Sequence, residues 1–132
     1  MPLERELLKS KIHRATVTEA AVNYVGSISI DEDLMEWVDL WPGEKVAVWS
    51  IDNRERIETY AIPAPRGSGQ IKLNGGAAHR FATGDLVVIV AFCRSAVPVE
   101  TRMILVDQRN RFVSEIQMPE MQGAPCVPAA LV

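Results

Sequence analysis

The feature that most constrains the fold is the segment DLVVIVAFC, residues 85–93, in which every residue after the opening aspartate is apolar. β-Branched residues dominate this run. An apolar run of this length is typical of a strand that is buried on both faces or lies in the wall of a barrel. The segment therefore favours a mainly β fold.

Strand signals dominate the rest of the chain as well. They occur in KIHRATVT (11–18), KVAVWSI (45–51), RIETYAI (56–62), GQIKLNG (69–75) and TRMILVD (101–107). Helix signals are few: DEDLMEWVDL (31–40) starts with a capping aspartate and acidic residues, and GGAAHRFATGD (75–85) has room for one or two turns. About six short strands with two short helices favour a closed or nearly closed β-barrel, because closure removes exposed strand edges.

Length and charge narrow the class of protein. The 132 residues fit one domain, residues 1–132, and the net charge of −3 argues against non-specific nucleic-acid binding. No apolar run approaches the roughly 20 residues of a membrane helix, and the charged start MPLERELLKSKIHR lacks the apolar core of a signal peptide. We therefore expect a cytoplasmic protein with neither a nucleic-acid nor a membrane partner.

The cysteines and histidines show no metal-type spacing. The chain has two cysteines, Cys93 and Cys126, and two histidines, His13 and His79, so we predict no metal site and no disulfide framework. The last segment, QMPEMQGAPCVPAALV, carries three prolines and no clear pattern. We expect a loose tail over about residues 118–132.

One strand-like segment, NYVGSISID (23–31), contains a bare Gly26-Ser27 pair. Glycine weakens a strand interior, because it loses more backbone entropy and has no side chain to pack. The ordinary explanation is a bulge or a tight turn. A second Gly-Ser pair at residues 67–68 means that the dipeptide by itself decides nothing.

Several polar residues also lie in strand-like segments, and each has an ordinary role as a solvated charge, an ion-pair partner, a core ring, a strand former or a turn residue. They are Lys11, His13, Arg56, Thr59, Tyr60 and Asn74. Strand alternation predicts that Lys11 and His13 share one face with Ala15 and Val17. Alternation also predicts that Thr59 and Tyr60 point to opposite faces.

Taken together, KIHRATVT, NYVGSISID, RIETYAI, RGSGQIKLNGGAAH and GDLVVIVAF resemble, in order and spacing, the aspartate 1-decarboxylases, pyruvoyl-dependent enzymes that make β-alanine for pantothenate. The resemblance covers residues 11–92 and is weaker through TRMILVDQRN. It implies a double-psi β-barrel and a homotetramer with sites at subunit interfaces. It also implies self-cleavage between Gly26 and Ser27, which yields chains 1–26 and 27–132.

The resemblance gives Ser27 a chemical role. Its Oγ attacks the carbonyl of Gly26, the peptide becomes an ester, and elimination followed by hydrolysis leaves ammonia and a covalently bound pyruvoyl group. Glycine suits the site because the attack needs an unhindered carbonyl and a strained backbone. Thr59 is the residue implied to assist this processing. The finished pyruvoyl group forms a Schiff base with the substrate amine and takes up the electrons released with CO2.

The resemblance also implies the residues that handle L-aspartate. Lys11 and Arg56 match the positions that bind the carboxylates, and Arg56 can bind one of them bidentately. Tyr60 matches the proton donor to the decarboxylated intermediate. The remaining substrate-binding positions are Asn74, Gly75, Gly76 and Ala77, and the pocket walls are His13, Tyr24 and Trp49.

Two alternatives stay open from the residues. The chain could be an uncleaved β-barrel that binds a small acidic ligand, or a pyruvoyl decarboxylase of another amino acid such as glutamate, because one methylene gives little discrimination. Val25 departs from the acidic or polar residue that many family members carry before the glycine, and it could alter the cleavage rate. Some bacterial members need a separate maturation protein, which is a further partner to test.

Overall fold

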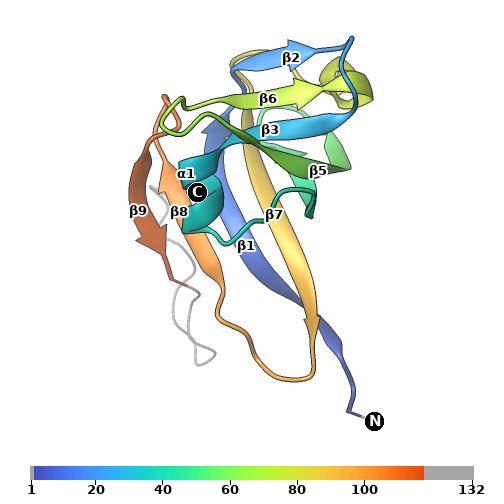
Figure 1. The fold of residues 1–132 in the computed structure, drawn as a ribbon, viewed down its shortest axis with the longest axis vertical. Coiled ribbons are helices and arrows are strands. Elements are labelled where there is room, and N and C mark those ends of the chain that lie inside the picture. The colour runs from blue at the N-terminus through green and yellow to red at the C-terminus, as the bar shows by residue number, and fades with distance from the viewer. Residues whose placement is uncertain (1, 118–132) are drawn as a thin grey trace.

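The structure, a computed structural model, describes residues 2–117 (Figure 1). Its helices are α1 (Glu32–Trp37) and the 3-10 helix η1 (Gly75–Arg80). Its strands are β1 (Arg5–Thr16), β2 (Glu19–Ala21), β3 (Ser27–Asp31), β4 (Lys45–Ser50), β5 (Arg56–Ala64), β6 (Ile71–Asn74), β7 (Leu86–Ser95), β8 (Arg102–Val106) and β9 (Phe112–Ile116).

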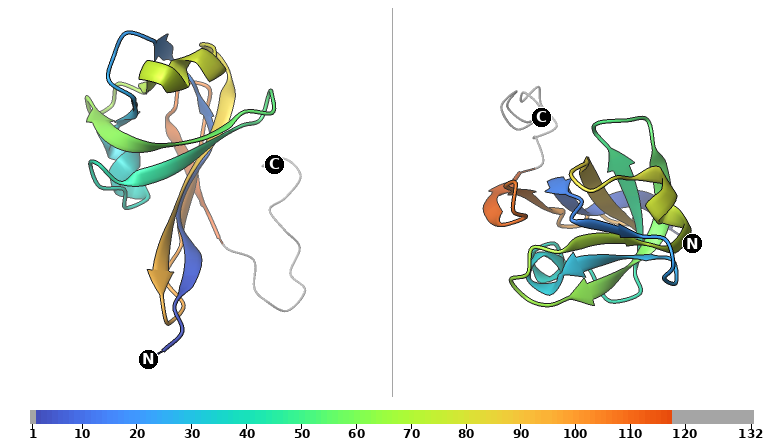
Figure 2. Two further views of the ribbon diagram at one scale, coloured as in Figure 1. Left: turned by 90° about the vertical axis from the view of Figure 1, so that its right-hand side faces the viewer. Right: turned by 90° about the horizontal axis from the view of Figure 1, so that it is seen from above.

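The strands form one hydrogen-bonded sheet in the order β2-β6-β3-β5-β4-β7-β1-β8-β9. The sheet is folded over itself, so that β2, β6 and β3 run across the direction of β1, β7 and β8 (Figures 1 and 2). Buried side chains from both halves, such as Ile28 and Leu73 on one side and Ile12 and Ile89 on the other, meet in a single core. The strand order ends at β2 and β9, so the arrangement is barrel-like without being closed by hydrogen bonds.

The predicted mainly β fold with two short helices is confirmed, and the predicted number of strands is too low. The described residues contain nine strands, where we expected about six. The extra ones include β2, which has three residues, and β9, and such short strands carry too little alternation to stand out. β1 also starts at Arg5, earlier than expected. The predicted loose tail, about residues 118–132, lies outside the described residues.

The apolar run at residues 85–93 forms most of β7, from Leu86 onward. Val87 to Ala91 are buried, as the sequence predicts. Phe92 is exposed, because β7 continues with β1 into a two-stranded ribbon that projects from the body (Figure 2). Burial on both faces therefore holds only where other layers cover the strand.

A β-bulge in β1 decides which face its side chains take. Ile12 pairs with Ile89 and Ala15 with Val87, so that two residues, His13 and Arg14, stand opposite one. Arg14 has φ 63°, a left-handed conformation. Ile12 and Ala15 are consequently both in the core. The prediction that Lys11 and His13 share a face with Ala15 and Val17 is wrong, because the bulge inverts the alternation between them.

The second Gly-Ser pair belongs to a loop that is anchored by Asp31, the N-cap residue of α1. The buried Asp31 carboxylate accepts hydrogen bonds from the backbone N–H groups of Asp33, Gly67 and Gly69. Gly69 has φ 68°, and a Cβ there would lie 2.5 Å from the carbonyl oxygen of Arg109. These glycines therefore serve a tight loop, unlike Gly26.

Candidate active site

Ser27 is the first residue of β3 and is only 3% exposed. The residues before it form a turn between β2 and β3, in which Tyr24 is 62% and Val25 82% exposed. The Gly26-Ser27 peptide thus lies at the junction between an exposed turn and a buried strand. This position combines an accessible backbone with a serine held by its strand neighbours.

Asn74, at the end of β6, fixes the serine side chain. Ser27 and Asn74 are paired in the antiparallel β3–β6 ladder. The Asn74 Nδ2 atom donates hydrogen bonds to Ser27 Oγ at 2.9 Å and to Ser29 Oγ at 3.1 Å. The Oδ1 atom of Asn74 is buried and has no hydrogen-bond partner within residues 2–117. An unsatisfied buried acceptor is costly, and such groups are frequent at functional sites.

Gly75 forms a cradle under the turn that precedes Ser27. Its φ of 70° is in the left-handed region. A Cβ at this position would lie 2.6 Å from Gly26 Cα, 2.7 Å from Gly26 N and 2.7 Å from the carbonyl oxygen of Tyr24. All three are backbone atoms, so no side chain can move aside. Only glycine lets η1 approach the Gly26 backbone this closely.

β5 brings Thr59 and Tyr60 to the same region, because it runs parallel to β3 with Ile28 paired to Ala61. Along β5, Tyr60 is exposed and Thr59 is half-buried, alternating with the buried Ala61. This pattern fits the prediction that the two side chains point to opposite faces. The register puts both residues beside the start of β3, next to Ser27.

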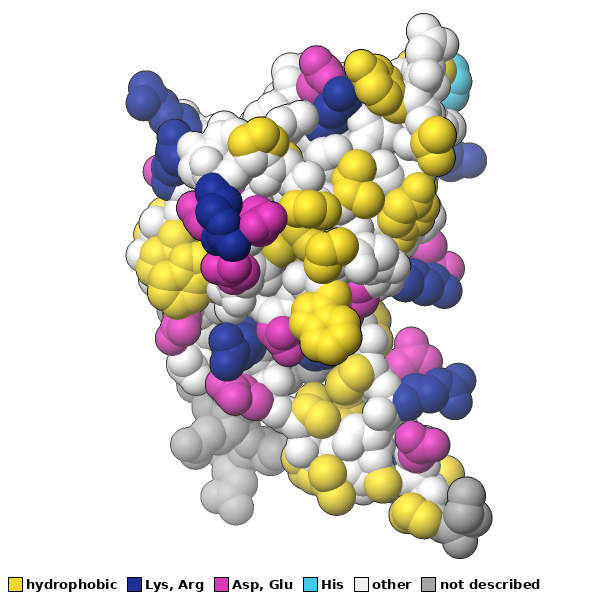
Figure 3. Space-filling model, in the orientation of Figure 1, with side chains coloured by type: hydrophobic (Ala, Val, Ile, Leu, Met, Phe, Trp, Pro, Cys, Tyr) yellow, Lys and Arg dark blue, Asp and Glu magenta, His cyan; other side chains and the backbone are white. Residues whose placement is uncertain are grey.

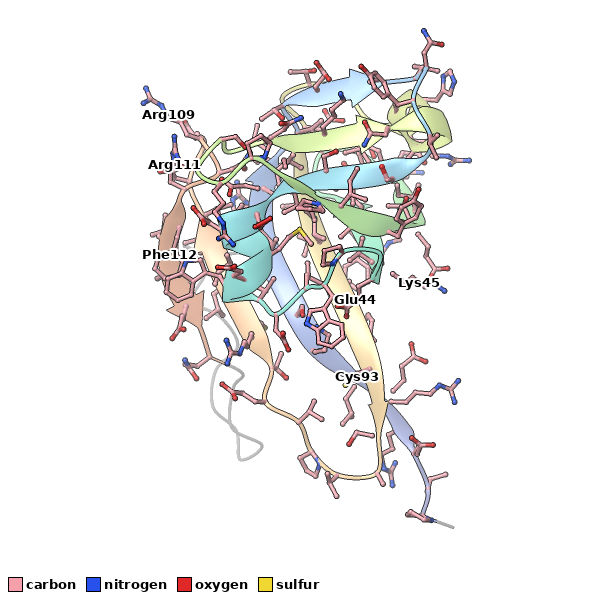
Figure 4. The ribbon with its side chains drawn as sticks, viewed as in Figure 1. Glu44, Lys45, Cys93, Arg109, Arg111 and Phe112 are labelled. Carbon is pink, nitrogen blue, oxygen red and sulfur yellow. The ribbon has the colours of Figure 1, made fainter. Side chains whose placement is uncertain are left out.

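Arg56 and Trp49 line a hollow of about 460 Å³ on the outer face of β4, β5 and β7. The two residues are cross-strand partners, and the Arg56 guanidinium lies 4.9 Å from the centre of the Trp49 ring. Lys45, labelled in Figure 4, and Glu58 also line the hollow and form an exposed ion pair at 3.1 Å. A planar cation stacked on an aromatic wall is suited to binding a carboxylate.

The sheet register carries Lys11 and His13 toward this same outer face. Lys11 pairs with Val90, which pairs in turn with Ala47 of the hollow. His13 lies in the bulge of β1 and is buried. The first pair of predicted positions, Lys11 and Arg56, thus lies on one side of the sheet, on strands separated by β7 and β4.

Within one chain, the predicted residues form two groups. The Ser27 group contains Tyr24, Gly26, Ser27, Thr59, Tyr60, Asn74 and Gly75, and the Arg56 group contains Trp49 and Arg56. Lys11 and His13 lie on β1, which β7 and β4 separate from β5, and they do not line the hollow that contains Arg56. Arg56 and Tyr60 are four residues apart on β5, so their Cα atoms are separated by about 13 Å, at about 3.3 Å per residue. Ser27 does not line the hollow that contains Arg56.

The last two predicted positions lie on η1. A Cβ at Gly76 would meet no atom within 4 Å, so this position of η1 faces open space. Ala77 is partly buried and packs against the hydrophobic core. The small residues thus line η1 on its open side, while Ala77 supports it from within.

Sequence reasoning missed Ser29 and Lys72. In the β3–β6 ladder, Ser29 pairs with Lys72, one step along from the Ser27–Asn74 pair. The spacing of two residues in Ser27-Ile28-Ser29 and in Lys72-Leu73-Asn74 was the available signal, because it puts each pair on one face.

Shifted pKa values occur away from both groups. Arg66, in the loop after β5, donates a hydrogen bond to Glu36 of α1 and holds the pKa of that carboxyl below its ordinary value, while the carboxylates around Arg66 raise the pKa of the guanidinium. Asp107 accepts backbone hydrogen bonds from Arg109 and Arg111, which lower its pKa. The two arginines are labelled in Figure 4. These are ion networks of the surface.

Residues 3–113 match the model of a protein family described as aspartate decarboxylase. The chain belongs to the aspartate decarboxylase family. Its sequence is 48% identical over 121 residues to the aspartate 1-decarboxylase of Carboxydothermus hydrogenoformans, an alignment that covers 89% of this chain and 94% of the relative. It is 50% identical over 121 residues to the enzyme of the same name from Pelotomaculum thermopropionicum, with 89% and 91% covered.

A third member of the aspartate decarboxylase family extends the match. The aspartate 1-decarboxylase of Laribacter hongkongensis is 42% identical over 127 residues, which covers 93% of this chain and all of the relative. The resemblance seen in the sequence is thereby confirmed. Within residues 2–117, no helix is long and apolar enough to cross a membrane.

Proposed function

We propose that this chain decarboxylates L-aspartate to β-alanine and CO2 for pantothenate biosynthesis, after cleaving itself between Gly26 and Ser27. The observation that carries the proposal is the arrangement around that peptide. A buried serine hydroxyl is held by Asn74 at 2.9 Å, and Gly75 packs under the preceding backbone. Membership of the aspartate decarboxylase family, whose relatives are named aspartate 1-decarboxylase, supports the same activity.

The residues present fit a pyruvoyl group at position 27. Such a group needs a serine at a glycine-preceded bond, donors near its oxygen atoms and space for an incoming amine. Ser27 follows Gly26, the Asn74 amide lies within hydrogen-bond distance, and the Gly26 backbone before it belongs to an exposed turn. A pyruvoyl group at this position supplies a ketone that captures the substrate amine and accepts the electron pair released with CO2.

The surrounding side chains bind the substrate and move protons. Arg56, stacked on Trp49, binds one carboxylate of aspartate bidentately, and Lys11 supplies a second positive charge on the same side of the sheet. Tyr60 donates a proton to the carbon that loses CO2. Thr59 stabilises the negative charge that develops on the Gly26 carbonyl oxygen during self-cleavage. The buried Oδ1 of Asn74 is available to accept a hydrogen bond from the substrate amine.

We infer that a complete site draws on two copies of the chain. Within one chain, Ser27 does not line the hollow that contains Arg56, and Lys11 lies on a strand that β7 and β4 separate from β5. The chain also exposes large apolar side chains, among them Leu3, Val25, Trp41 and Val97, and Figure 3 shows apolar side chains over β3 and β5 and down the β1–β7 ribbon. Exposed apolar surface of this kind marks association sites. We therefore propose a homotetramer with each site at a subunit interface.

Denaturing mass spectrometry tests the central proposal. Wild-type protein is expected to give two chains, residues 1–26 and a longer chain whose first residue is blocked by the pyruvoyl group, together with β-alanine production from aspartate. Ser27→Ala is expected to stay intact and inactive. Two fragments from Ser27→Ala would assign cleavage to a protease. An intact, inactive wild type that binds aspartate would favour the uncleaved binder, and a preference for glutamate would change the substrate.

Subunit mixing tests the shared site. Ser27→Ala and Arg56→Ala are each expected to be inactive alone. Co-assembled subunits pair an intact residue 27 with an intact Arg56 at some interfaces, so activity is expected to return. A monomer in light scattering, or no recovered activity after proven co-assembly, would place the site in one chain. A cytoplasmic location and a separate maturation protein stay predictions.

A further inference from the structure

Lys72 joins the turn that contains the scissile peptide to the rest of the sheet. It lies on β6, where it is paired with Glu19 of β2 in a parallel ladder and with Ser29 of β3 in an antiparallel one. Its Nζ atom lies 3.0 Å from Glu19 Oε2, and its side chain is 15% exposed. This lysine is therefore a partly buried cation between the two strands that flank the turn.

The same ammonium group contacts the turn directly. Lys72 Nζ lies 4.1 Å from the centre of the Tyr24 ring. Tyr24 is 62% exposed, so the Lys72 ammonium is a contact that an otherwise largely solvated side chain makes with the body of the protein. A cation over an aromatic face is attracted by the ring quadrupole, more strongly when the pair is partly desolvated.

Three residues of β6 and η1 therefore hold the residues around the cleavage point. Gly75 packs under Gly26 and the Tyr24 carbonyl, Asn74 hydrogen-bonds Ser27, and Lys72 holds Tyr24 and Glu19. Lys72 and Asn74 lie on the same face of the strand, because they are two residues apart. In Figure 1 the turn between β2 and β3 lies beside the helix that follows β6.

β2 cannot order this turn alone. It has three residues and lies at one end of the sheet order, with β6 as its only neighbour there. Self-cleavage needs the Ser27 hydroxyl and the Gly26 carbonyl in a near-attack geometry. The cleavage rate is proportional to the fraction of molecules that hold this geometry, so a less ordered turn cleaves more slowly. A contact that restrains Tyr24 restrains the Gly26 carbonyl two residues later.

We propose that Lys72 is a positioning residue for self-cleavage, and that it sets the cleavage rate by holding the turn through Glu19 and the Tyr24 ring. The proposal rests on the cleavage at Gly26-Ser27 proposed above. Lys72 takes no part in bond making, and once the chain is cut it no longer affects chemistry at residue 27. Its loss slows maturation without changing turnover.

The test follows newly made, pulse-labelled full-length chain in cell extract by denaturing mass spectrometry. Lys72→Met keeps the length of the side chain and removes its charge, and it is expected to cleave about fivefold to tenfold more slowly than wild type. Lys72→Arg restores both contacts and is expected to return the rate to within about twofold. Arg80→Met is the matched control, since it removes an exposed ion pair with Glu55 and is expected to cleave at the wild-type rate.

Three further measurements separate positioning from a general structural role. The melting temperature of Lys72→Met in a Ser27→Ala background is expected to match that of Ser27→Ala alone. The kcat and KM of fully cleaved Lys72→Met, per cleaved chain, are expected to match wild type. Tyr24→Leu is expected to slow cleavage, and adding Lys72→Met to it to slow cleavage less than Lys72→Met does alone.

Each opposing result has a distinct meaning. Cleavage of Lys72→Met at the wild-type rate overturns the positioning role and leaves the proposed function intact. Slow cleavage in both Lys72→Met and Lys72→Arg, or a lowered melting temperature in the Ser27→Ala background, overturns it in favour of a structural role. A wild-type chain that stays intact overturns the cleavage proposal itself, and with it this one.

Discussion

Replacing Gly75 by alanine is the sharpest perturbation of the cleavage point that the structure offers. The added Cβ would lie 2.6 Å from Gly26 Cα, whereas ordinary contacts begin at 3.4 Å, so the two backbones must separate by about 0.8 Å. Because the atoms that it meets belong to the backbone, the displacement falls on the scissile segment itself. Misplacement by about 1 Å can cost roughly a hundredfold in rate.

The stability cost of Gly75→Ala has two parts. Alanine at φ 70° costs about 1–2 kcal/mol, and forcing an extra methyl against packed backbone costs about 1–3 kcal/mol more. Gly84 separates these parts, because it has φ 96° and nothing within 4 Å of its would-be Cβ. Gly84→Ala lacks the clash, and its backbone strain is at least as large because φ 96° lies further from the left-handed well. The clash at Gly75, about 1–3 kcal/mol, is therefore at least as large as the difference between the two variants.

The assay measures cleavage and stability separately. Intact-mass time courses of Gly75→Ala are expected to show cleavage slowed about a hundredfold, while Gly84→Ala cleaves at the wild-type rate. Denaturant unfolding is measured in a Ser27→Ala background at one protein concentration, so that every variant is a single uncut chain. Equal cleavage rates in Gly75→Ala and Gly84→Ala would refute the argument that Gly75 holds the scissile backbone in place.

Three further predictions follow from the same geometry. Arg56→Lys keeps the charge and loses the planar fork above Trp49, so kcat/KM per cleaved chain should fall about tenfold or more while cleavage is unchanged; near wild-type kinetics would make it a surface residue. Tyr60→Phe should cleave normally and turn over poorly, whereas Thr59→Val should accumulate uncut chain, and the reverse pattern would exchange their roles. Arg66→Gln should lower the melting temperature at pH 7. Because Arg66 holds the pKa of Glu36 below its ordinary value of 4.5, the difference from wild type should shrink as the pH falls below 4.5. A difference that does not depend on pH would assign the loss to packing.

The segments that identify the fold class are legible in the sequence because they depend on local chemistry. The middle of the apolar run, Val87 to Ala91, becomes the buried part of β7, and the capping Asp31 with its acidic neighbours begins α1. The Gly26-Ser27 pair and the order of the surrounding segments were enough to predict the family. These signals can be recognised in the sequence because burial, capping and turn formation each require particular residue types within a few positions of one another.

Features that depend on contact between distant segments were decided by the tertiary structure. The bulge at His13 and Arg14 reverses the faces of β1, because its pairing with β7 accommodates two residues opposite one. The length of β1 and the strands β2 and β9 likewise follow from pairing rather than from strong local patterns.

The candidate site divides in the same way. The sequence by itself determined which residue types it contains: a glycine-serine peptide, two cations, a threonine-tyrosine pair and an asparagine before two glycines. Only the folded chain puts Gly75 under Gly26, Lys72 over Tyr24, and Arg56 away from Ser27. The physical reason is that residue type sets what a side chain can bind, whereas strand register and close backbone packing set what it meets.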